Sequence, residues 1–427
     1  MTQLVPLRRN TTFQLLWAGS AISSVGTELT RLATPLLVLA TTGSAVLAAV
    51  VAGTRSAAAL LAQIPAGVWV DRWDRRRTLV TSQAVQAGTA AVLAVAVLGG
   101  EKWIWAFVPL AVVDGICSCF VGPVRTTAIG SVVPPPQLRQ AFAQEEARSL
   151  AARLVGPPLG GLLYSFGRTI PFLVDAVTFL AATICAVLAK VPRRPVLTSE
   201  PSSASSAEEA RKPSMRAELG EAFTWIWRQR GLRNITGAVL ILNLIGGAFL
   251  LPVIVLVQER GGSDVATGIV LAGIGIGGLV GAIAAPRTGN ILPPGKLLLA
   301  VLGTFGACLA TMALPLGPWW PTIPLICLSL ATPALNVVMG AVFVQLVPKE
   351  MLGRMDAVLT VCERSLAPLG PPLGGFLAAA IGGANALIIL GCVLVLTAVV
   401  AALSRELRDF TGDDRPVDAP GEAAEHS

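Results

Sequence analysis

Several ionisable side chains lie within segments that are otherwise apolar and long enough to cross a membrane. A charge at mid-membrane costs about 2.5–3.5 kcal/mol on the insertion scale, so such residues are candidates for function. With a rise of about 1.5 Å per helical residue, one group falls near mid-depth and another nearer the outside. The first group is Arg55, Asp114, Arg153, Glu363 and Arg364, and the second is Glu28 and Arg31.

Two chemical roles fit these residues. A carboxylate in such a place can accept and release a proton as a cavity changes sides, because gaining or losing an arginine contact changes its proton affinity. Glu28 and Asp114 are the first choices for this proton coupling. Alternatively, the same residues form static ion pairs that hold helices together. Glu28 and Arg31, three residues apart, share a helical face and can pair.

The other charges, with two asparagines, are candidates for the wall of a substrate cavity. We expect this cavity between two halves of the chain, lined by the first, second, fourth, fifth, seventh, eighth, tenth and eleventh helices. Each asparagine could equally form a hydrogen bond between helices. The wall candidates are Arg31, Arg55, Arg153, Asn243, Asn336, Glu363 and Arg364.

The composition places these residues in a membrane protein. The 427 residues are 54% hydrophobic and only 13% charged, with a mean hydropathy of +0.71. About 20 apolar residues span a bilayer, and apolar runs of that length predict an all-α integral membrane protein with twelve transmembrane helices. The approximate spans are 12–40, 45–70, 78–99, 104–131, 141–166, 170–190, 234–258, 265–285, 297–315, 322–347, 356–380 and 385–403.

The chain also repeats itself. The segment "VPPPQLRQAFAQEEARSLAARLVGPPLGGLL" from Val133 aligns without a gap with "VPKEMLGRMDAVLTVCERSLAPLGPPLGGFL" from Val347. This predicts two pseudo-symmetric six-helix halves, residues 1–190 and 234–403. Between them, residues 191–233 have the composition of a cytoplasmic linker with an interfacial helix, and residues 404–427 form a disordered cytoplasmic tail. The repeat copied the scaffold and not the charge, since Glu28 corresponds to Leu242 and Asp114 to Leu328.

The basic residues indicate the orientation of the chain. Most of the 32 Lys and Arg fall on one side of the predicted spans, and basic residues are retained in the cytoplasm, so both termini are expected there. This bias accounts for the net charge of +7 without a nucleic-acid partner. The seven cysteines lie inside predicted helices and the only histidine is His426, so neither disulfides nor a metal site are expected.

Two motifs have both a structural and a functional interpretation. The stretch "GVWVDRWDRRRTLV" predicts a short charged loop, whose arginines would anchor helix ends at anionic headgroups. The sequence "GPPLGG" would either pack helices closely or supply matched bends that let the two halves rock. The loop residues are Gly67, Asp71, Arg72, Arg75, Arg76 and Arg77, and the bend residues are Gly156, Pro157, Gly160 and Gly161.

On these motifs the chain resembles the major facilitator superfamily, in particular its twelve-helix drug efflux branch, which includes macrolide-efflux-like and siderophore-exporter-like proteins. The loop is similar to the family signature between the second and third helices, with Asp74 in place of the usual second glycine. The "GPPLGG" copy in the fifth helix looks like the family's antiporter signature. The resemblance implies that Asp71 helps to close the cytoplasmic side and that transport runs outward.

The expected function is therefore secondary active efflux from the cell membrane, coupled to protons, of a small amphiphilic molecule such as an antibiotic, secondary metabolite or siderophore. Membrane lipids are expected partners, the chain is expected to be monomeric, and no cofactor is expected. No phosphate-binding glycine loop indicates direct use of ATP, and an enzyme is not expected. The alternatives are a proton-coupled importer of a small solute and a membrane receptor or scaffold without transport.

Overall fold

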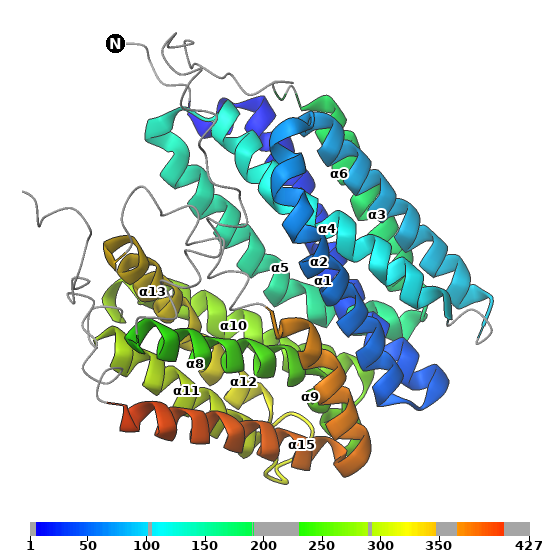
Figure 1. The fold of residues 1–427 in the computed structure, drawn as a ribbon. Helices are drawn as coiled ribbons and strands as arrows, with labels where there is room; N and C mark the ends of the chain where they lie inside the picture. Colours follow the sequence, from blue (N-terminus) through cyan, green and yellow to red (C-terminus); the bar gives the residue numbers. More distant parts are fainter. Residues whose placement is uncertain are drawn as a thin grey trace, which may run out of the picture.

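The computed structural model describes residues 6–100, 105–189, 191, 230–288, 293–346 and 365–404. Every regular element in these ranges is a helix, which confirms the predicted all-α fold. The helices form two groups that follow the two halves of the chain (Figure 1). One group runs from α1 to α6, blue to green in the figure, and the other from α8 to α15, green to red.

The first group consists of long helices joined by short turns. The 3-10 turn η1 (Leu7–Arg9) precedes α1, and η3 (Pro135–Gln137) precedes α5. Asn10 caps α1 by accepting a hydrogen bond from the Phe13 N–H at 3.1 Å. The helices are α1 (Thr11–Thr42), α2 (Ala45–Arg72), α3 (Arg75–Leu98), α4 (Phe107–Val132), α5 (Leu138–Phe166) and α6 (Ile170–Leu188).

The second group contains more interruptions. Its helices are α8 (Arg230–Ala248), α9 (Leu250–Glu259), α10 (Asp264–Thr288), α11 (Pro294–Met312), α12 (Thr322–Leu330), α13 (Thr332–Leu346) and α15 (Gly370–Leu403), with η5 (Ala367–Leu369) before α15. Gly382 breaks α15 with a φ of 82°, between the predicted spans 356–380 and 385–403. Glu259 at the end of α9 stabilises this break, because its Oε1 accepts the Gly383 N–H at 3.2 Å.

The helices expose apolar side chains, as expected for contact with lipid. Leu61, Val95, Leu98 and Val177 are each at least 65% exposed although they lie within apolar helices. By length and composition, nine stretches in the described ranges could cross a membrane, and the longest is Ala367–Leu403, which contains the break at Gly382. The exact count of twelve stays a prediction. Residues 192–229 of the predicted linker (191–233) and 405–427 of the predicted tail (404–427) lie outside the described residues.

The two groups meet mainly through two helix pairs, α2 with α15 and α5 with α10. In the first pair, a Cβ placed on Gly53 would lie 2.6 Å from the Pro372 ring. In the second, a Cβ on Gly161 would lie 2.5 Å from the Asp264 carbonyl oxygen. These contacts involve the beginning of α2 and the end of α5. With the Gly275–Leu154 contact near the middle of α5, the groups therefore touch along the half of the molecule that contains the α1–α2 and α5–α6 turns, away from the α2–α3 turn.

The charged stretch from Gly67 corrects one expectation. A loop was predicted there, but α2 continues to Arg72 and α3 begins at Arg75, so only Trp73 and Asp74 lie between the helices. Asp74 is the N-cap of α3, and its Oδ1 accepts the Arg77 N–H at 2.9 Å. A capping carboxylate satisfies a free N–H group of the first turn, which is a physical reason for an aspartate where a glycine was expected.

Candidate functional site

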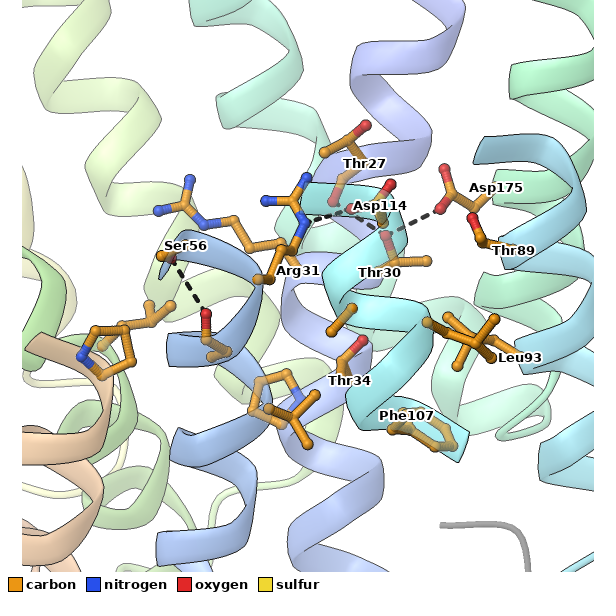
Figure 2. A pocket seen from close by; sticks show the side chains of 18 of the residues that line it. Thr27, Thr30, Arg31, Thr34, Ser56, Thr89, Leu93, Phe107, Asp114 and Asp175 are labelled. Atoms are coloured by element: carbon orange, nitrogen blue, oxygen red, sulfur yellow. Dashed lines mark hydrogen bonds and ion pairs between the residues drawn. The ribbon is translucent and has the colours of Figure 1, made fainter. Parts of the chain in front are cut away.

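A cavity of about 300 Å³ lies between the two groups of helices (Figure 2). Its wall comes mainly from α1, α2, α3, α4 and α6, and α8, α9, η5 and α15 supply the opposite side. The side chains mix apolar surface with hydroxyl, amide and charged groups. The polar wall residues are Thr27, Thr30, Arg31, Thr34, Arg55, Ser56, Gln86, Thr89, Asp114, Asp175 and Asn243.

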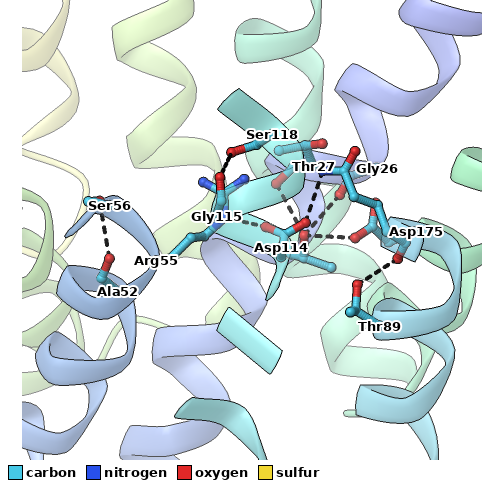
Figure 3. A network of polar contacts seen from close by, with 12 residues as sticks. Gly26, Thr27, Ala52, Arg55, Ser56, Thr89, Asp114, Gly115, Ser118 and Asp175 are labelled. Atoms are coloured by element: carbon cyan, nitrogen blue, oxygen red, sulfur yellow. Dashed lines mark hydrogen bonds and ion pairs between the residues drawn. The ribbon is translucent and has the colours of Figure 1, made fainter. Parts of the chain in front are cut away.

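An ion pair between α2 and α4 dominates the polar side of the cavity. Arg55 Nε lies 2.5 Å from Asp114 Oδ2 (Figure 3), and Gln86 Nε2 donates to Asp114 Oδ1 at 3.0 Å. The carboxylate thus receives bonds from two helices besides its own. The side chains of Arg55 and Asp114 are 39% and 21% exposed, so water reaches the pair from the cavity. Both sequence candidates therefore reach the cavity and contact each other.

The close approach of α2 and α4 requires a glycine. A Cβ on Gly115, next to Asp114, would collide with the backbone carbonyl of Arg55. The two helices can therefore come within ion-pairing distance only because residue 115 has no side chain. Figure 3 shows Gly115 beside Arg55.

Asp175 on α6 is a cavity residue that the sequence analysis missed. It is only 5% exposed, and its Oδ2 accepts the Thr30 hydroxyl of α1 at 3.1 Å. Its Oδ1 is buried and has no hydrogen-bond partner among the residues that the structure describes. The signal was present, since Asp175 is the only charged residue between Arg168 and Lys190, and the rule used for the other intramembrane charges applies to it.

Glu28 and Arg31 form the predicted pair along α1, with 3.4 Å between Glu28 Oε1 and Arg31 Nη1. The two side chains differ in exposure, at 16% and 58% respectively. Arg31 lines the cavity, whereas Glu28 is not among its wall residues. Glu28 instead lies against α5, where a Cβ on Gly156 would collide with the Glu28 Cβ.

A second charged cluster, not predicted, joins α1, α4 and α5. Glu145 Oε2 lies 3.2 Å from Arg125 Nε and 2.9 Å from Arg148 Nη2. Arg148 also donates to the Ser20 carbonyl at 2.9 Å and to the Ser24 hydroxyl. These bonds to the backbone and side chains of α1 indicate a role in holding α5 against α1. The cluster is not part of the cavity wall.

The other predicted cavity residues are dispersed. Asn243 on α8 lines the cavity, but Arg153 on α5 and Asn336 on α13 are exposed and are not among its wall residues. Glu363 and Arg364 lie outside the described residues. The predicted fifth and eighth helices, α5 and α10, do not line this cavity, because they pack against each other, while α3 and α6 do line it.

The predicted gate residues lie around the α2–α3 turn. Gly67, Asp71 and Arg72 fall in the last turns of α2, where the described structure gives the backbone but not the side chains. Arg75, Arg76 and Arg77 form the first turn of α3. The Arg76 guanidinium donates to the Val187 carbonyl at the end of α6, and so ties this turn to its own half of the molecule.

The "GPPLGG" motif makes close helix contacts on both sides of α5. Gly156 and Gly160 face α1, and a Cβ on Gly160 would lie 3.1 Å from the Leu29 carbonyl oxygen. Pro157 and Gly161 face α10, where the Pro157 carbonyl lies against Gly268. The helix α5 continues through both prolines. The motif therefore allows α5 to pack against its own half and against the opposite half, and the bend stays a prediction.

Among the described residues, no group of three or more His, Cys, Asp or Glu side chains is arranged to hold a metal ion. The six described cysteines are free thiols, and Cys362 lies outside the described residues. The chemistry available in the cavity is therefore that of carboxyl, guanidinium, amide and hydroxyl groups beside apolar surface.

Residues 16–364 match the sequence model of the Major Facilitator Superfamily. The multidrug efflux pump Tap of Mycolicibacterium fortuitum is 26% identical, over 94% of this chain and 98% of the relative. Macrolide efflux protein A of Streptococcus pyogenes is 23% identical, over 93% of this chain and 96% of the relative. Both similarities extend over nearly the whole of each chain.

Solved structures share the fold at low identity. A bacterial homologue of the human lysosomal transporter Spinster, in an inward-facing and unoccupied conformation, superposes with a TM-score of 0.71 at 16% identity, over 96% of this chain and all of that one. The nucleoside transporter NupG superposes with a TM-score of 0.71 at 12% identity, over 92% of this chain and 98% of that one.

Proposed function

The chain belongs to the Major Facilitator Superfamily and is a multi-pass membrane transporter rather than an enzyme, and from this premise we propose that it exports small amphiphilic molecules by proton antiport. The observation that carries the proposal is the cavity between the two helix groups, with an ion pair in its wall. Transport by alternating access needs a site of this kind, at the interface of two halves that rock around it.

The lining of the cavity supports an amphiphilic substrate. Phe107, Phe179 and Leu93 offer apolar surface, while Arg31 and Asn243 offer polar contacts from opposite groups. Sites for organic ligands typically combine a mostly apolar wall with a few polar groups that fix orientation. The names of the relatives, a multidrug efflux pump and a macrolide efflux protein, favour drug-like compounds and outward transport.

We place both termini in the cytoplasm because of the distribution of basic residues. In that orientation the two groups touch at the outer end, so the cavity would be reached from the cytoplasm. Asp71 and the arginines of the α2–α3 turn would then close the cytoplasmic end in the opposite conformation. A single chain supplies both sides of the cavity, which supports a monomeric transporter.

Coupling to protons requires a carboxyl that changes its protonation state with the conformation. Glu28 and Asp114 are the candidates from the sequence, and each has an arginine within ion-pairing distance. Such a pair can link protonation to conformation. A proton on the carboxyl would release the arginine, and a conformational change would alter the contact.

The test compares cells with and without the protein for accumulation of, and resistance to, a panel of compounds that includes a macrolide and several amphiphilic cations. We expect lower accumulation and higher resistance for some compounds in expressing cells, with both effects lost after the proton gradient is collapsed. Higher accumulation in expressing cells would overturn the direction and favour an importer. Binding of a compound by the purified protein without flux into proteoliposomes would favour a receptor.

A further inference from the structure

Asp175 differs from every other carboxylate near the cavity in having no cation beside it. Glu28 is paired with Arg31 and Asp114 with Arg55. Asp175 forms no ion pair with any of the residues that the structure describes, and its near neighbours are hydroxyl groups. The five charged side chains of this region are thus two matched pairs and one unmatched carboxyl.

Side chains from α1, α2, α3 and α4 surround Asp175. The charges of Asp114 and Arg55 act on it with opposite signs across the cavity, and these two groups are paired with each other. α5 also packs against α6, and the ion pairs of its described residues join Glu145 to Arg125 and Arg148, not to Asp175. The facing groups are Thr30 on α1, Gln86 and Thr89 on α3, Asp114 on α4 and Arg55 on α2, and Arg31 of α1 lies on the same cavity wall.

Charge balance therefore depends on the protonation of Asp175. With a proton on this carboxyl, the region holds two negative and two positive charges in contact. Without the proton, one negative charge is left uncompensated on a side chain that is 5% exposed. An isolated buried carboxylate is costly in a medium of low dielectric constant, and a proton is the smallest species that removes the cost.

The packing also leaves space for the group. Gly26 on α1 faces Asp175, and a Cβ on Gly26 would collide with Asp175 Oδ1 and the Thr178 hydroxyl. The carboxyl therefore fits between α1 and α6 only because residue 26 has no side chain. Oδ1, the oxygen without a partner, lies at this contact and can hold a proton without breaking an existing bond.

We propose that Asp175 is the proton-binding site that couples the pH gradient to transport, and that the Arg55–Asp114 and Glu28–Arg31 pairs keep their charges throughout the cycle. The inference rests on the proposed function and refines it. In the cycle, Asp175 takes a proton from water when the cavity is open to the outside. It returns the proton to water when the cavity is open to the cytoplasm.

The first experiment detects the proton itself and needs no transported substrate. The protein is reconstituted in lipid, and the infrared C=O stretching band of protonated carboxyls is recorded while the pH is varied. Wild type should gain and lose this band reversibly. Asp175→Asn should lack that component, whereas Asp114→Asn, Glu28→Gln and the control Glu146→Gln, at an exposed position on α5, should keep it. Persistence of that same component in Asp175→Asn would overturn the proposal.

The second experiment measures coupling in proteoliposomes with a radiolabelled macrolide. Asp175→Asn should lose uptake driven by an imposed pH gradient, down to the level of protein-free liposomes, but should keep macrolide exchange without a gradient. Asp175→Glu, which keeps a carboxyl, should restore part of the driven flux. Thermal unfolding of each variant in detergent shows whether it is folded.

The outcomes separate this inference from the proposed function. Wild-type flux without any response to pH overturns proton antiport, and the infrared band still reports independently whether Asp175 binds a proton. Full gradient-driven flux in Asp175→Asn overturns the assignment of Asp175 while proton antiport stands. Wild-type flux that follows a sodium gradient, with no titrating component that Asp175→Asn removes, would overturn the assignment in favour of a cation held by Asp175 and neighbouring hydroxyls.

Discussion

At the scale of single residues, the Arg55–Asp114 pair illustrates how a membrane protein keeps charge inside its helices. The pair is partly hydrated from the cavity, and Gln86 completes the coordination of the carboxylate. Removing one member of such a pair leaves the other without compensation, whereas removing both leaves only neutral groups. Comparing single and double variants of the pair can thus separate an effect on stability from an effect on proton coupling.

We predict that Asp114→Asn and Arg55→Gln each lower the free energy of unfolding by about 1–3 kcal/mol, since each leaves an unpaired polar group that is only partly hydrated. The double variant should lose less than the sum of the two, because neither charge is then left alone. Thermal unfolding of the four proteins in one detergent measures this. Additive losses would mean that the two side chains do not interact in the folded protein.

At the scale of elements, glycines set how closely the helices approach each other. The contacts between the two halves depend most on this close approach. Gly275 on α10 is buried against α5, where its Cβ position would collide with the Leu154 Cα. Association of helices in a membrane relies on close packing rather than on a hydrophobic driving force, so a bulky residue in such a place has a direct effect. The α5–α10 pair is therefore sensitive to side-chain size.

We predict that Gly275→Leu separates α5 from α10 and shifts the population toward conformations with the outer end open. Distances between spin labels on the ends of α5 and α10 near the α5–α6 turn should increase, and cysteines placed there should react faster. Gly88→Leu on α3, where a Cβ meets nothing within 4 Å, is the matched control. An unchanged distance distribution in Gly275→Leu would contradict this account of the contact.

The break in α15 gives a second test at this scale. Gly382 has a φ of 82° and a ψ of 163°, a backbone conformation that is essentially restricted to glycine and costs other residues about 1–3 kcal/mol. Gly382→Ala should therefore lower the unfolding temperature. The control Gly303→Ala, at an open position within α11, should raise it slightly, because alanine favours a helix interior. An unfolding temperature for Gly382→Ala equal to that of Gly303→Ala would show that the break is not held in this conformation.

At the scale of the whole molecule, the two halves touch at the end near the α1–α2 turn and the cavity lies between them. A transporter must visit the opposite arrangement, with the α2–α3 turn drawn toward the second half. The described residues show only one of the two arrangements, so mutations are needed to test the contacts of the other. The charged stretch from Gly67 is the natural place to perturb.

We predict that Asp71→Asn leaves insertion into the membrane intact but slows turnover, because it weakens closure of the cytoplasmic end. Cysteines introduced at the starts of α3 and α5 should become more accessible to a membrane-impermeant reagent applied from that side. Arg139→Gln, which removes a charge at an exposed position in the first turn of α5, outside the predicted gate, is the control for a general effect of charge. Unchanged flux and accessibility in Asp71→Asn would leave the stretch as a topological anchor.

The sequence alone determined the class of the molecule and its family. Apolar length and sparse charge require helices in a bilayer, because the backbone must bond internally there, and the gapless repeat around "GPPLGG" indicates two related halves. Periodicity along one helix also predicted the Glu28–Arg31 pair, since the partners are only three residues apart. These are local or compositional properties, which do not depend on how helices are arranged.

Only the tertiary structure decided which charges meet. Arg55 and Asp114 are far apart in sequence and lie on different helices, and their contact depends on the packing of α2 against α4 at Gly115. The same arrangement leaves Arg153 and Asn336 away from the cavity wall and brings Asp175 to it without a cation. A sequence gives the depth of each residue in the membrane. The rotation and the neighbours of each helix, set by small residues at helix contacts, determine which residues form the site.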